Sequence, residues 1–457
     1  MNKRPTYEVM AAELEKMSLP PETFCLAPYI TTDLDQDGSV LTCYRGKTRL
    51  GNWKEQPFGE SFNGKKIQDI RKDLILGIEN KNCVSCYNAE KKGSVSPRMN
   101  FFFDYINGWI TTPGVDMFDK IKRNFKKGDI EDIARIEIRP SSLCNQRCMH
   151  CGPHSSTKWI ETLANEENYR IYEENDGILR NGMGPIDHKE LRWDNIVSYY
   201  KGSLTSDAKY KDDIMHLLDS SSIVNFTGGE PLLTPEHSEY LDYFVNKTGS
   251  STSKVLEYST NLNIKNIERY FDYWREFKTV TFRISIDSCF DTYNYFRTFG
   301  NIDLIKENLK KITAFKEQCK QDKKAKIKIF ASITFNFFSA LRWREIAQDW
   351  SDYGLEFHAS LILDHPVSVK YLPRDLSQRA LTEMQWCIDN AEQYFADKFE
   401  KDAFIHHTKN CMNFIQGFKN QFNTFDPMVI KYIDFCDKTS GNNVLDYYPE
   451  LEEYLKL

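Results

Sequence analysis

The stretch at residues 136–156 reads IEIRPSSLCNQRCMHCGPHSS, and it places three cysteines directly after an apolar, strand-like run. Cys144, Cys148 and Cys151 have the spacing C-x3-C-x2-C. Three thiolates on one short loop can bind one face of a four-iron cluster, because each sulfur ligates a different iron. The fourth iron is then open to a substrate or cofactor. Zinc is the alternative from spacing alone, although structural zinc sites normally take four protein ligands.

The sequence around this loop alternates strand and helix patterns, which is typical of a parallel α/β fold. Helical patterns include 263–277, 301–319 and 341–353. The six predicted strands are Ile133–Arg139, Ile223–Thr227, Lys254–Thr260, Val280–Asp287, Ile327–Thr334 and Phe357–Ile362. Parallel α/β enzymes carry their chemistry at the carboxyl ends of strands. The cysteine loop follows the first strand and therefore lies where an active site is expected.

Changes in composition divide the 457 residues into four predicted regions. A small cysteine- and turn-rich domain spans 1–100, and a connector spans 101–130. The α/β unit spans 131–365, and a polar insertion at 155–222 interrupts it. We expect this insertion to be either a lid or a solvated surface excursion. A helical C-terminal region covers 366–457.

Composition and charge disfavour two classes of partner. Acidic residues outnumber basic ones, 66 against 60, giving a net charge of −6, so a nucleic-acid partner is not expected. No apolar run reaches the ~20 residues that cross a bilayer, and the N-terminus lacks the apolar segment of a secretory signal. We therefore expect a cytoplasmic protein with no membrane partner. Twelve cysteines in that compartment favour metal or cluster ligands over lasting disulfides.

A second group of cysteines lies in the N-terminal region. Cys25 and Cys43 follow the pattern C-x12-G-x4-C, in which Gly38 is the glycine, and Cys83 and Cys86 follow as C-x2-C. Four thiolates at these spacings can complete either a four-cysteine zinc site or a fully ligated [4Fe–4S] cluster. The ligand chemistry leaves both alternatives open.

The cysteine loop resembles the signature of the radical S-adenosylmethionine (SAM) superfamily, C-x3-C-x-Φ-C, with His150 at the usually aromatic position. The sequence FTGGEPLL at the end of the second strand resembles the GGE motif of that family. The resemblance implies that Gly228, Gly229 and Glu230 hold the amino group of SAM. A close backbone approach at glycines and a carboxylate facing an ammonium agree with this role.

Two later strand ends and one further segment resemble the same family. The third strand ends in YSTNL, which implies a position for Asn261 near SAM. The fourth strand, FRISIDS, offers Ser285 and Asp287 to the ribose hydroxyls or to the methionine moiety. In the segment YNYFR, Arg297 would pair with the SAM carboxylate. The resemblance covers roughly residues 133–365 and implies a partial (β/α)6 radical SAM barrel.

The N-terminal cysteines and the stretches CLAPY, DQDGSVLTC, LGN and CVSC around them resemble the twitch domain. This domain is the half-size version of the SPASM domain, which carries auxiliary clusters in radical SAM enzymes. In the familiar members it follows the barrel, whereas here it precedes it. A cluster with four protein ligands has no open iron, which favours an electron-transfer or structural role.

Together these resemblances imply a radical SAM oxidoreductase or modifying enzyme. Its first cluster would cleave SAM reductively to a 5′-deoxyadenosyl radical, which abstracts hydrogen from a substrate. The expected cofactors are SAM, the SAM-binding [4Fe–4S] cluster and an auxiliary [4Fe–4S] cluster that helps to oxidise or modify the substrate. The expected partners are a small-molecule or peptide substrate and an external one-electron donor such as flavodoxin or ferredoxin. The alternative is a zinc-binding scaffold or interaction protein without SAM chemistry.

Overall fold

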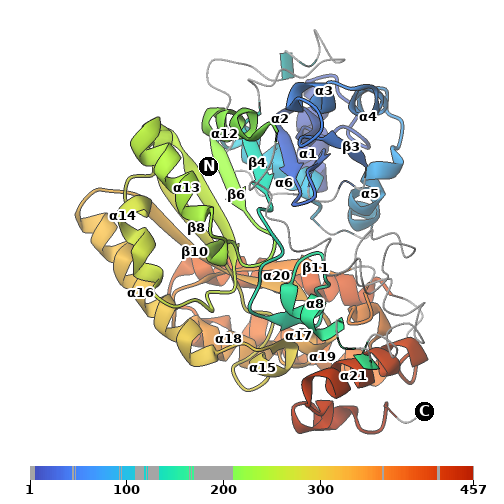
Figure 1. The fold of residues 1–457 in the computed structure, drawn as a ribbon. Helices are drawn as coiled ribbons and strands as arrows, with labels where there is room; N and C mark the ends of the chain where they lie inside the picture. The colour runs from blue at the N-terminus through green and yellow to red at the C-terminus, as the bar shows by residue number, and fades with distance from the viewer. Residues whose placement is uncertain are drawn as a thin grey trace.

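A nine-stranded sheet forms the centre of the molecule, in the order β11–β10–β8–β7–β6–β4–β1–β2–β3 (Figure 1). The computed structural model describes residues 6–43, 46, 48–91, 93, 95–108, 118–119, 121, 133–163, 165, 167–168, 209–362, 365–418 and 422–455. The strands are β1 (Thr31–Leu34), β2 (Ser39–Leu41), β3 (Arg49–Asn52), β4 (Arg135–Ile138), β6 (Ile223–Phe226), β7 (Val255–Thr260), β8 (Thr279–Ser285), β10 (Lys326–Phe335) and β11 (Glu356–Leu361). Most of the predicted insertion at 155–222 lies outside the described residues.

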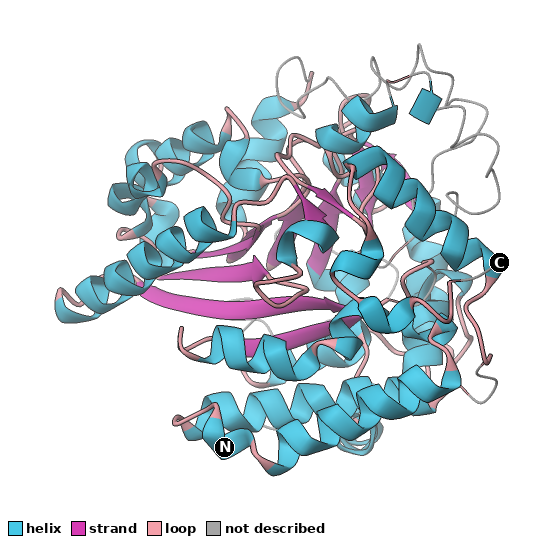
Figure 2. Cartoon of the chain, turned by 90° about the horizontal axis from the view of Figure 1, so that it is seen from below, coloured by secondary structure: helices cyan, strands magenta, loops and turns pink. Residues whose placement is uncertain are grey.

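The six predicted strands correspond to β4, β6, β7, β8, β10 and β11, with ends that differ from the prediction by two residues at most. These six strands pair parallel in chain order. The expected α/β class with a large parallel sheet is therefore confirmed. Figure 2 shows the strands in the middle of the molecule with helices around them.

Helices precede, connect and follow the strands of the sheet. Those before β4 are α1 (Tyr7–Lys16), α2 (Ala27–Ile30), α3 (Phe58–Phe62), α4 (Lys65–Ile75), α5 (Val84–Lys91) and α6 (Pro97–Ile106). Those between β4 and β11 are α8 (Thr157–Leu163), α12 (Lys211–Ser220), α13 (His237–Asp242), α14 (Phe271–Trp274), α15 (Tyr293–Phe296), α16 (Ile302–Gln321), α17 (Phe337–Leu341) and α18 (Trp343–Ser351). The C-terminal helices are α19 (Arg374–Asp389), α20 (Lys398–Gln416) and α21 (Pro427–Ser440). Within the described ranges, no helix has the length and apolarity to cross a membrane.

The prediction of one helix over 263–277 is wrong. Asn266 has a φ of 56°, a left-handed conformation that cannot continue a right-handed helix. The chain forms a 3-10 turn at Ile267–Tyr270 and then the single turn of α14. By contrast, the helix expected over 301–319 is present as α16.

The N-terminal cysteine-rich region joins the sheet of the α/β unit. Strand β1 pairs parallel with β4, so that Asp33 is the register partner of Glu137. Strands β2 and β3 continue the sheet as an antiparallel hairpin. Gly38 lies in the turn between β1 and β2 with a φ of 87°, a conformation that favours glycine. One continuous sheet therefore connects the two groups of cysteines.

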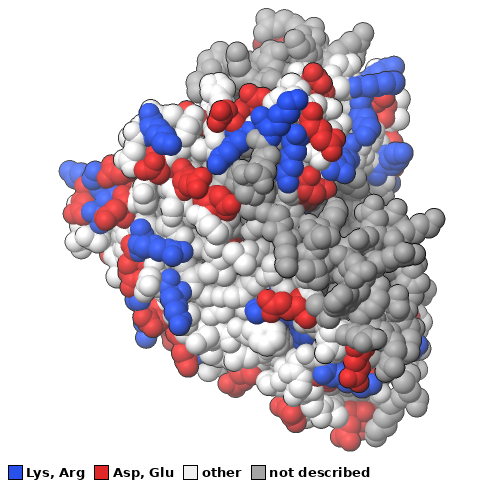
Figure 3. All heavy atoms as spheres, viewed as in Figure 1, with Lys and Arg blue, Asp and Glu red and all other residues white. Residues whose placement is uncertain are grey.

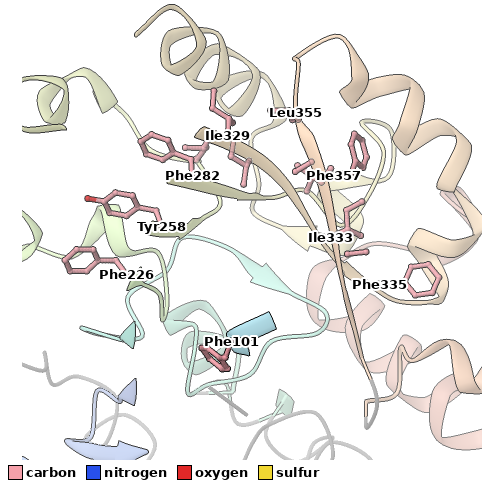
Figure 4. Close-up of a cluster of buried hydrophobic side chains, with 14 of the residues drawn as sticks. Phe101, Phe226, Tyr258, Phe282, Ile329, Ile333, Phe335, Leu355 and Phe357 are labelled. Carbon is pink, nitrogen blue, oxygen red and sulfur yellow. The ribbon is translucent and has the colours of Figure 1, made fainter. Parts of the chain in front are cut away.

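One face of the parallel sheet packs apolar side chains against the helices. Phe226, Tyr258 and Phe282 are register partners on β6, β7 and β8. Their rings stack with centroid distances of 5.6 and 5.5 Å (Figure 4). Trp274 of α14 packs edge-on against Phe282 at 4.8 Å. These aromatic layers form the core on the helix side of the sheet.

The opposite face of the same strands is polar. One register row across six strands consists of Asp33, Glu137, Asn225, Glu257, Thr281 and Lys328. Parallel strands that are buried on both faces normally carry apolar residues on both. All of this row except Lys328 is buried, so this face differs from the apolar face that packs against the helices.

The buried Glu257 carboxyl on this polar face is expected to make the stability of the fold depend on pH. Burial would raise the pKa of its carboxyl, but Arg135 and Arg283 lower this pKa to about 2. Their nitrogens lie 2.5 and 3.1 Å from a carboxylate oxygen. Because the folded pKa lies below the unfolded value, the stabilisation is present above about pH 4.5 and is lost as the pH falls towards 2.

We expect Glu257→Gln to lower the free energy of unfolding at pH 7 by about 3 kcal/mol, from ~1.4 kcal/mol per pKa unit. Urea denaturation between pH 2 and pH 7 measures this effect. Glu268→Gln, at an exposed salt bridge with Lys311, is the control and should cost under about 1 kcal/mol. Equal acid sensitivity in wild type and Glu257→Gln would contradict the assignment.

Candidate functional site

A cavity of about 570 Å³ lies at the carboxyl ends of the parallel strands. It brings together nine of the residues singled out from the sequence: Cys144, Cys148, Cys151, His150, Gly228, Gly229, Asn261, Ser285 and Arg297. Glu230 and Asp287, also from that set, do not line the cavity. They contact Asn261 and Arg297, which do. Cavities of roughly 300–1,000 Å³ are typical of small-molecule and cofactor sites.

A short two-stranded sheet fixes the position of the cysteine loop. Strand β5 (Arg147–Cys148) pairs antiparallel with β9 (Arg297–Thr298), and Cys148 is the register partner of Arg297. The Arg297 guanidinium donates to Cys148 Sγ at 3.3 Å and also forms a buried ion pair with Asp287. Asp287 in turn accepts a hydrogen bond from the backbone N–H of Thr334 at 2.5 Å. The chain thus places a permanent cation beside a cysteine sulfur.

The three thiols face one another and face hydrogen-bond donors. A hydrogen bond between the Cys148 and Cys151 thiols lowers the pKa of Cys148 and raises that of Cys151. Burial, followed by the charge of Cys148, raises the pKa of Cys144 to about 12. Asn261 Nδ2 lies 3.8 Å from Cys144 Sγ. Sulfurs grouped in this way and supplied with N–H donors suit iron, which ionises the thiols that bind it.

The two glycines of the GGE motif pack against the start of the cysteine loop. Gly229 N donates to the carbonyl of Ser141 at 3.0 Å, and Glu230 N donates to that of Leu143 at 2.7 Å. A Cβ atom on Gly229 would lie 2.3 Å from the Leu143 carbonyl oxygen, and Gly228 has a φ of 108°. Because Gly228 and Gly229 have no side chain, their backbone can pack directly against the cysteine loop.

We expect Gly229→Ala to displace the cysteine loop, because the added Cβ meets backbone rather than a movable side chain. The free energy of unfolding should fall by about 1–3 kcal/mol, and iron bound at the triad should fall with it. Urea denaturation and iron analysis measure both effects. Gly249→Ala, where a Cβ meets nothing within 4 Å, should leave the iron content unchanged. Full iron content in Gly229→Ala would contradict this account of the glycine.

Glu230 connects the GGE motif to the end of β7. Its carboxylate accepts hydrogen bonds from Thr260 Oγ1 at 2.7 Å and from the backbone N–H of Asn261 at 2.6 Å. Burial raises the pKa of this carboxyl to about 7. Glu230 thereby holds Asn261, whose amide reaches Cys144, in place.

His150 provides a neutral aromatic ring within the cysteine loop. It stacks on Phe296 with a centroid distance of 5.4 Å and an interplanar angle of 15°. Burial lowers its pKa to about 4, so the ring is uncharged at neutral pH. Its Nδ1 lies 3.6 Å from the carboxylate of Asp287.

Several cavity-lining residues were not singled out from the sequence as site residues. They are Glu137, Arg139, Gln146, Ser155, Ser156, Thr227 and Ser259. His154 also lines the cavity. Most of these side chains come from the polar face of the strands or from the cysteine loop. The sequence signal that could have identified the residues on the strands is the alternation of polar and apolar residues in RIEIR (135–139) and EYST (257–260).

The C-terminal helix α21 supports the cysteine loop from outside the cavity. Arg147 donates to Thr439 Oγ1 at 2.7 Å and to the Cys436 carbonyl at 3.3 Å. The Tyr432 hydroxyl donates to the carbonyl of Met149. Residues from the distant C-terminus therefore hold the loop on both sides of Cys148.

The four N-terminal cysteines form a second group. Burial raises the pKa of the Cys25 thiol, and the charges of Cys83, Cys43 and Cys86 raise it further. Burial and Cys86 likewise raise the pKa of Cys83 to about 11. The four thiols are therefore near enough to interact. Nowhere in the described ranges are three or more His, Cys, Asp or Glu side chains arranged to hold a single metal ion.

Comparison with solved structures gives only weak likenesses. A structure of anSMEcpe with bound AdoMet matches 57% of this chain and 59% of its own, with 12% identity and a TM-score of 0.35. A structure of anSMEcpe with bound AdoMet and Kp18Cys peptide matches 57% and 61%, with 14% identity and a TM-score of 0.35. Streptococcus suis SuiB matches 78% and 68%, with 13% identity and a TM-score of 0.29. The chain thus spans about three fifths of the length of the first two. TM-scores this low do not establish a shared fold.

Comparison with sequences is informative for the N-terminal region. No curated protein matches the chain significantly. The model of the SPASM family, an iron–sulfur cluster-binding domain, matches residues 25–87, which begin at Cys25 and include Cys43, Cys83 and Cys86. This N-terminal segment is therefore of the SPASM type, as its resemblance to the twitch domain implied.

Proposed function

We propose that the chain is a radical SAM enzyme whose catalytic cluster is held by Cys144, Cys148 and Cys151. The supporting observation is the single cavity of about 570 Å³ that all three cysteines line. Residues from separate parts of the chain converge on the same space, namely Gly228, Gly229, Asn261, Ser285 and Arg297. A zinc scaffold has no need for such a cavity beside its ligands.

A four-iron cluster held by Cys144, Cys148 and Cys151 would supply the one electron that reductive cleavage of SAM to methionine and a 5′-deoxyadenosyl radical requires. The chain contributes the surroundings for this chemistry. Arg297 and Asn261 donate towards cysteine sulfurs, which offsets thiolate charge. Asp287 orients Arg297, and His150 adds an uncharged aromatic wall. The burial of these groups excludes water from the reacting centre.

We further propose that Cys25, Cys43, Cys83 and Cys86 hold an auxiliary [4Fe–4S] cluster. The match of residues 25–87 to an iron–sulfur domain supports a cluster over zinc at this site. Four protein ligands leave no open iron, so the role assigned is electron transfer. Acceptance of an electron from the substrate radical would make the net reaction an oxidation.

Cys83→Ala is expected to lower bound iron by about four per chain, the content of one cubane cluster. SAM cleavage at the separate triad should persist, while any oxidised product should no longer form. Iron and zinc analysis, together with assay of 5′-deoxyadenosine, measure the effect. Cys411→Ala, at a buried thiol outside both groups, is the control. Loss of zinc with unchanged iron would contradict the auxiliary cluster.

The proposed partners are a small-molecule or peptide substrate and an external one-electron donor such as flavodoxin or ferredoxin, in the cytoplasm. The charge pattern fits a partner other than nucleic acid. Figure 3 shows acidic and basic side chains interspersed over the described part of one face. Interspersed charges on the described part of this face and a net charge of −6 favour a partner other than nucleic acid.

The test of the proposed function is the release of 5′-deoxyadenosine. Anaerobically reconstituted chain is incubated with SAM and dithionite, and the product is quantified by liquid chromatography. We expect formation that depends on protein, SAM and reductant together. A reconstituted, folded chain that binds zinc and yields no deoxyadenosine would favour the zinc-binding scaffold instead.

A further inference from the structure

Gln146 lies in the cysteine loop, between the proposed cluster ligands Cys144 and Cys148. Its side chain is 0% exposed, and the residue lines the same cavity as the three cysteines. The Ser156 hydroxyl donates to the Gln146 backbone carbonyl at 2.6 Å, which fixes the residue in the loop. Glutamine is mostly an exposed residue, and buried polar atoms normally have hydrogen-bond partners. The partners of the two amide atoms therefore indicate what this side chain does.

The oxygen end of the Gln146 amide faces Arg297. The guanidinium donates to Gln146 Oε1 at 3.4 Å. A guanidinium has N–H donors and no acceptor, so the amide oxygen, and not the amide nitrogen, must lie on this side. The Cys148 thiol donates to the same oxygen at 4.0 Å. These contacts hold the amide beside the sulfur of a proposed cluster ligand and determine which way the amide is turned.

The nitrogen end of the same amide has no hydrogen-bond partner. Gln146 Nε2 is buried, and no acceptor among the described residues reaches it with the geometry of a hydrogen bond. Burial raises the pKa of the nearby Tyr293 hydroxyl, an effect that the Gln146 amide opposes, but this hydroxyl donates to the Ser285 carbonyl at 3.4 Å. A buried N–H without an acceptor is costly. We therefore expect its acceptor to be a group that binds in the cavity.

Iron bound at the triad would bring acceptors to this amide. Iron ionises the thiols that bind it, so the cavity would then contain thiolates and the bridging sulfides of a cluster. Both kinds of sulfur accept hydrogen bonds from N–H groups, and such bonds affect the reduction potential of a cluster. The carboxylate of SAM is a second acceptor that could enter the cavity, and the test separates it from the cluster.

We propose that Gln146 Nε2 donates a hydrogen bond to a sulfur of the cluster held by Cys144, Cys148 and Cys151 and thereby raises the reduction potential of this cluster. Reduction adds negative charge, so a donor on a sulfur stabilises the reduced state more than the oxidised state. Arg297 keeps the amide turned so that its nitrogen is free for this bond. The inference rests on the proposed function, because it requires the cluster at this triad.

The test is a redox titration of the anaerobically reconstituted chain without SAM, followed by electron paramagnetic resonance. The signal that Cys148→Ala removes identifies the triad cluster. Gln146→Glu keeps an oxygen towards Arg297 and replaces the N–H donor, and Gln146→Met removes the donor without adding a charge. In both variants the ratio of reduced to oxidised cluster at a fixed potential should fall about ten-fold, which is a midpoint lower by about 59 mV for one electron.

The control is Gln385→Glu, which adds the same charge at an exposed position of α19 outside the cavity. It should leave the ratio unchanged, as should the signal of the auxiliary cluster in every Gln146 variant. Equilibrium dialysis of the oxidised chain with SAM is carried out on the same samples. Gln146→Met should keep the SAM affinity of the wild type, because the donor is assigned to the cluster.

Each other outcome overturns the proposal. Unchanged ratios in both Gln146 variants would assign Nε2 to the Tyr293 hydroxyl. A lower ratio in Gln146→Glu alone would show that the added charge, and not the lost donor, causes the fall. An unchanged ratio with a loss of SAM affinity would assign the donor to SAM. Loss of iron from both variants would show that Gln146 only holds the loop together.

Failure of this inference and failure of the proposed function give different results. Iron and 5′-deoxyadenosine are measured on the same preparations. A wild-type chain with no triad signal and no deoxyadenosine would contradict the proposed function. A wild-type chain with both, whose ratio of reduced to oxidised cluster is shared by the Gln146 variants, would contradict only the hydrogen bond from Gln146.

Discussion

Cys148→Ala is expected to reduce 5′-deoxyadenosine formation to the level of a protein-free control. Cys148 is the middle ligand of the proposed cluster, and its sulfur lies 3.3 Å from the Arg297 guanidinium. Only two thiolates would then hold the cluster, so it would bind to the loop less tightly and have two open irons. Bound iron should therefore fall by about four per chain. Iron analysis and the deoxyadenosine assay measure the two effects together.

The matched control is Cys319→Ala, because Cys319 is buried on α16 outside both cysteine groups. It should retain full iron content and full SAM cleavage. Retention of the N-terminal iron in Cys148→Ala would show that the chain is folded. Deoxyadenosine at the wild-type rate in Cys148→Ala would contradict the assignment of the triad.

Arg297→Met is expected to lower the free energy of unfolding by about 3–5 kcal/mol, the usual cost of removing one partner of a buried ion pair. The Arg297 side chain is 5% exposed and the Asp287 side chain is fully buried. Without the guanidinium, Asp287 keeps the N–H of Thr334 but loses its cation. Binding of SAM should also be lost. Thermal unfolding and equilibrium dialysis with SAM measure the two effects.

A double substitution separates the structural effect from the effect on SAM. Arg297→Met combined with Asp287→Asn removes both charges, so much of the stability should return while SAM binding stays lost. Lys438→Met, at an exposed pair with Asp434, is the control and should cost under about 1 kcal/mol. Restored SAM binding in the double variant would show that Arg297 stabilises the fold and does not bind SAM.

The parallel sheet and the cysteine loop could be predicted because their signals are local. Each strand is a short apolar run between turns, and the thiols of Cys144, Cys148 and Cys151 lie on one loop. The helix predicted over 263–277 failed at Asn266, since a left-handed residue leaves no mark in the hydrophobic pattern. The polar residues at alternate positions of RIEIR and FRIS lie on the polar face of the sheet, which the description of these strands as apolar runs did not predict.

Contacts between distant segments could not be predicted from one sequence. Arg139 reaches Asp35 across 104 residues, and Arg147 reaches Thr439 across 292 residues. No local pattern specifies that β1 pairs with β4 or that α21 supports the cysteine loop. The glycines of the GGE motif were recognised, but their packing against Leu143 became visible only in three dimensions.

The electron paramagnetic resonance spectrum of the reduced, reconstituted chain, recorded before and after addition of SAM, tests whether Cys144, Cys148 and Cys151 hold a cluster with an open iron. SAM is expected to change the signal of one cluster, because three cysteine ligands leave one iron open to it. The change should persist in Cys83→Ala and vanish in Cys148→Ala. A cluster signal that SAM leaves unaltered in the wild type would show that this triad does not hold a SAM-binding cluster.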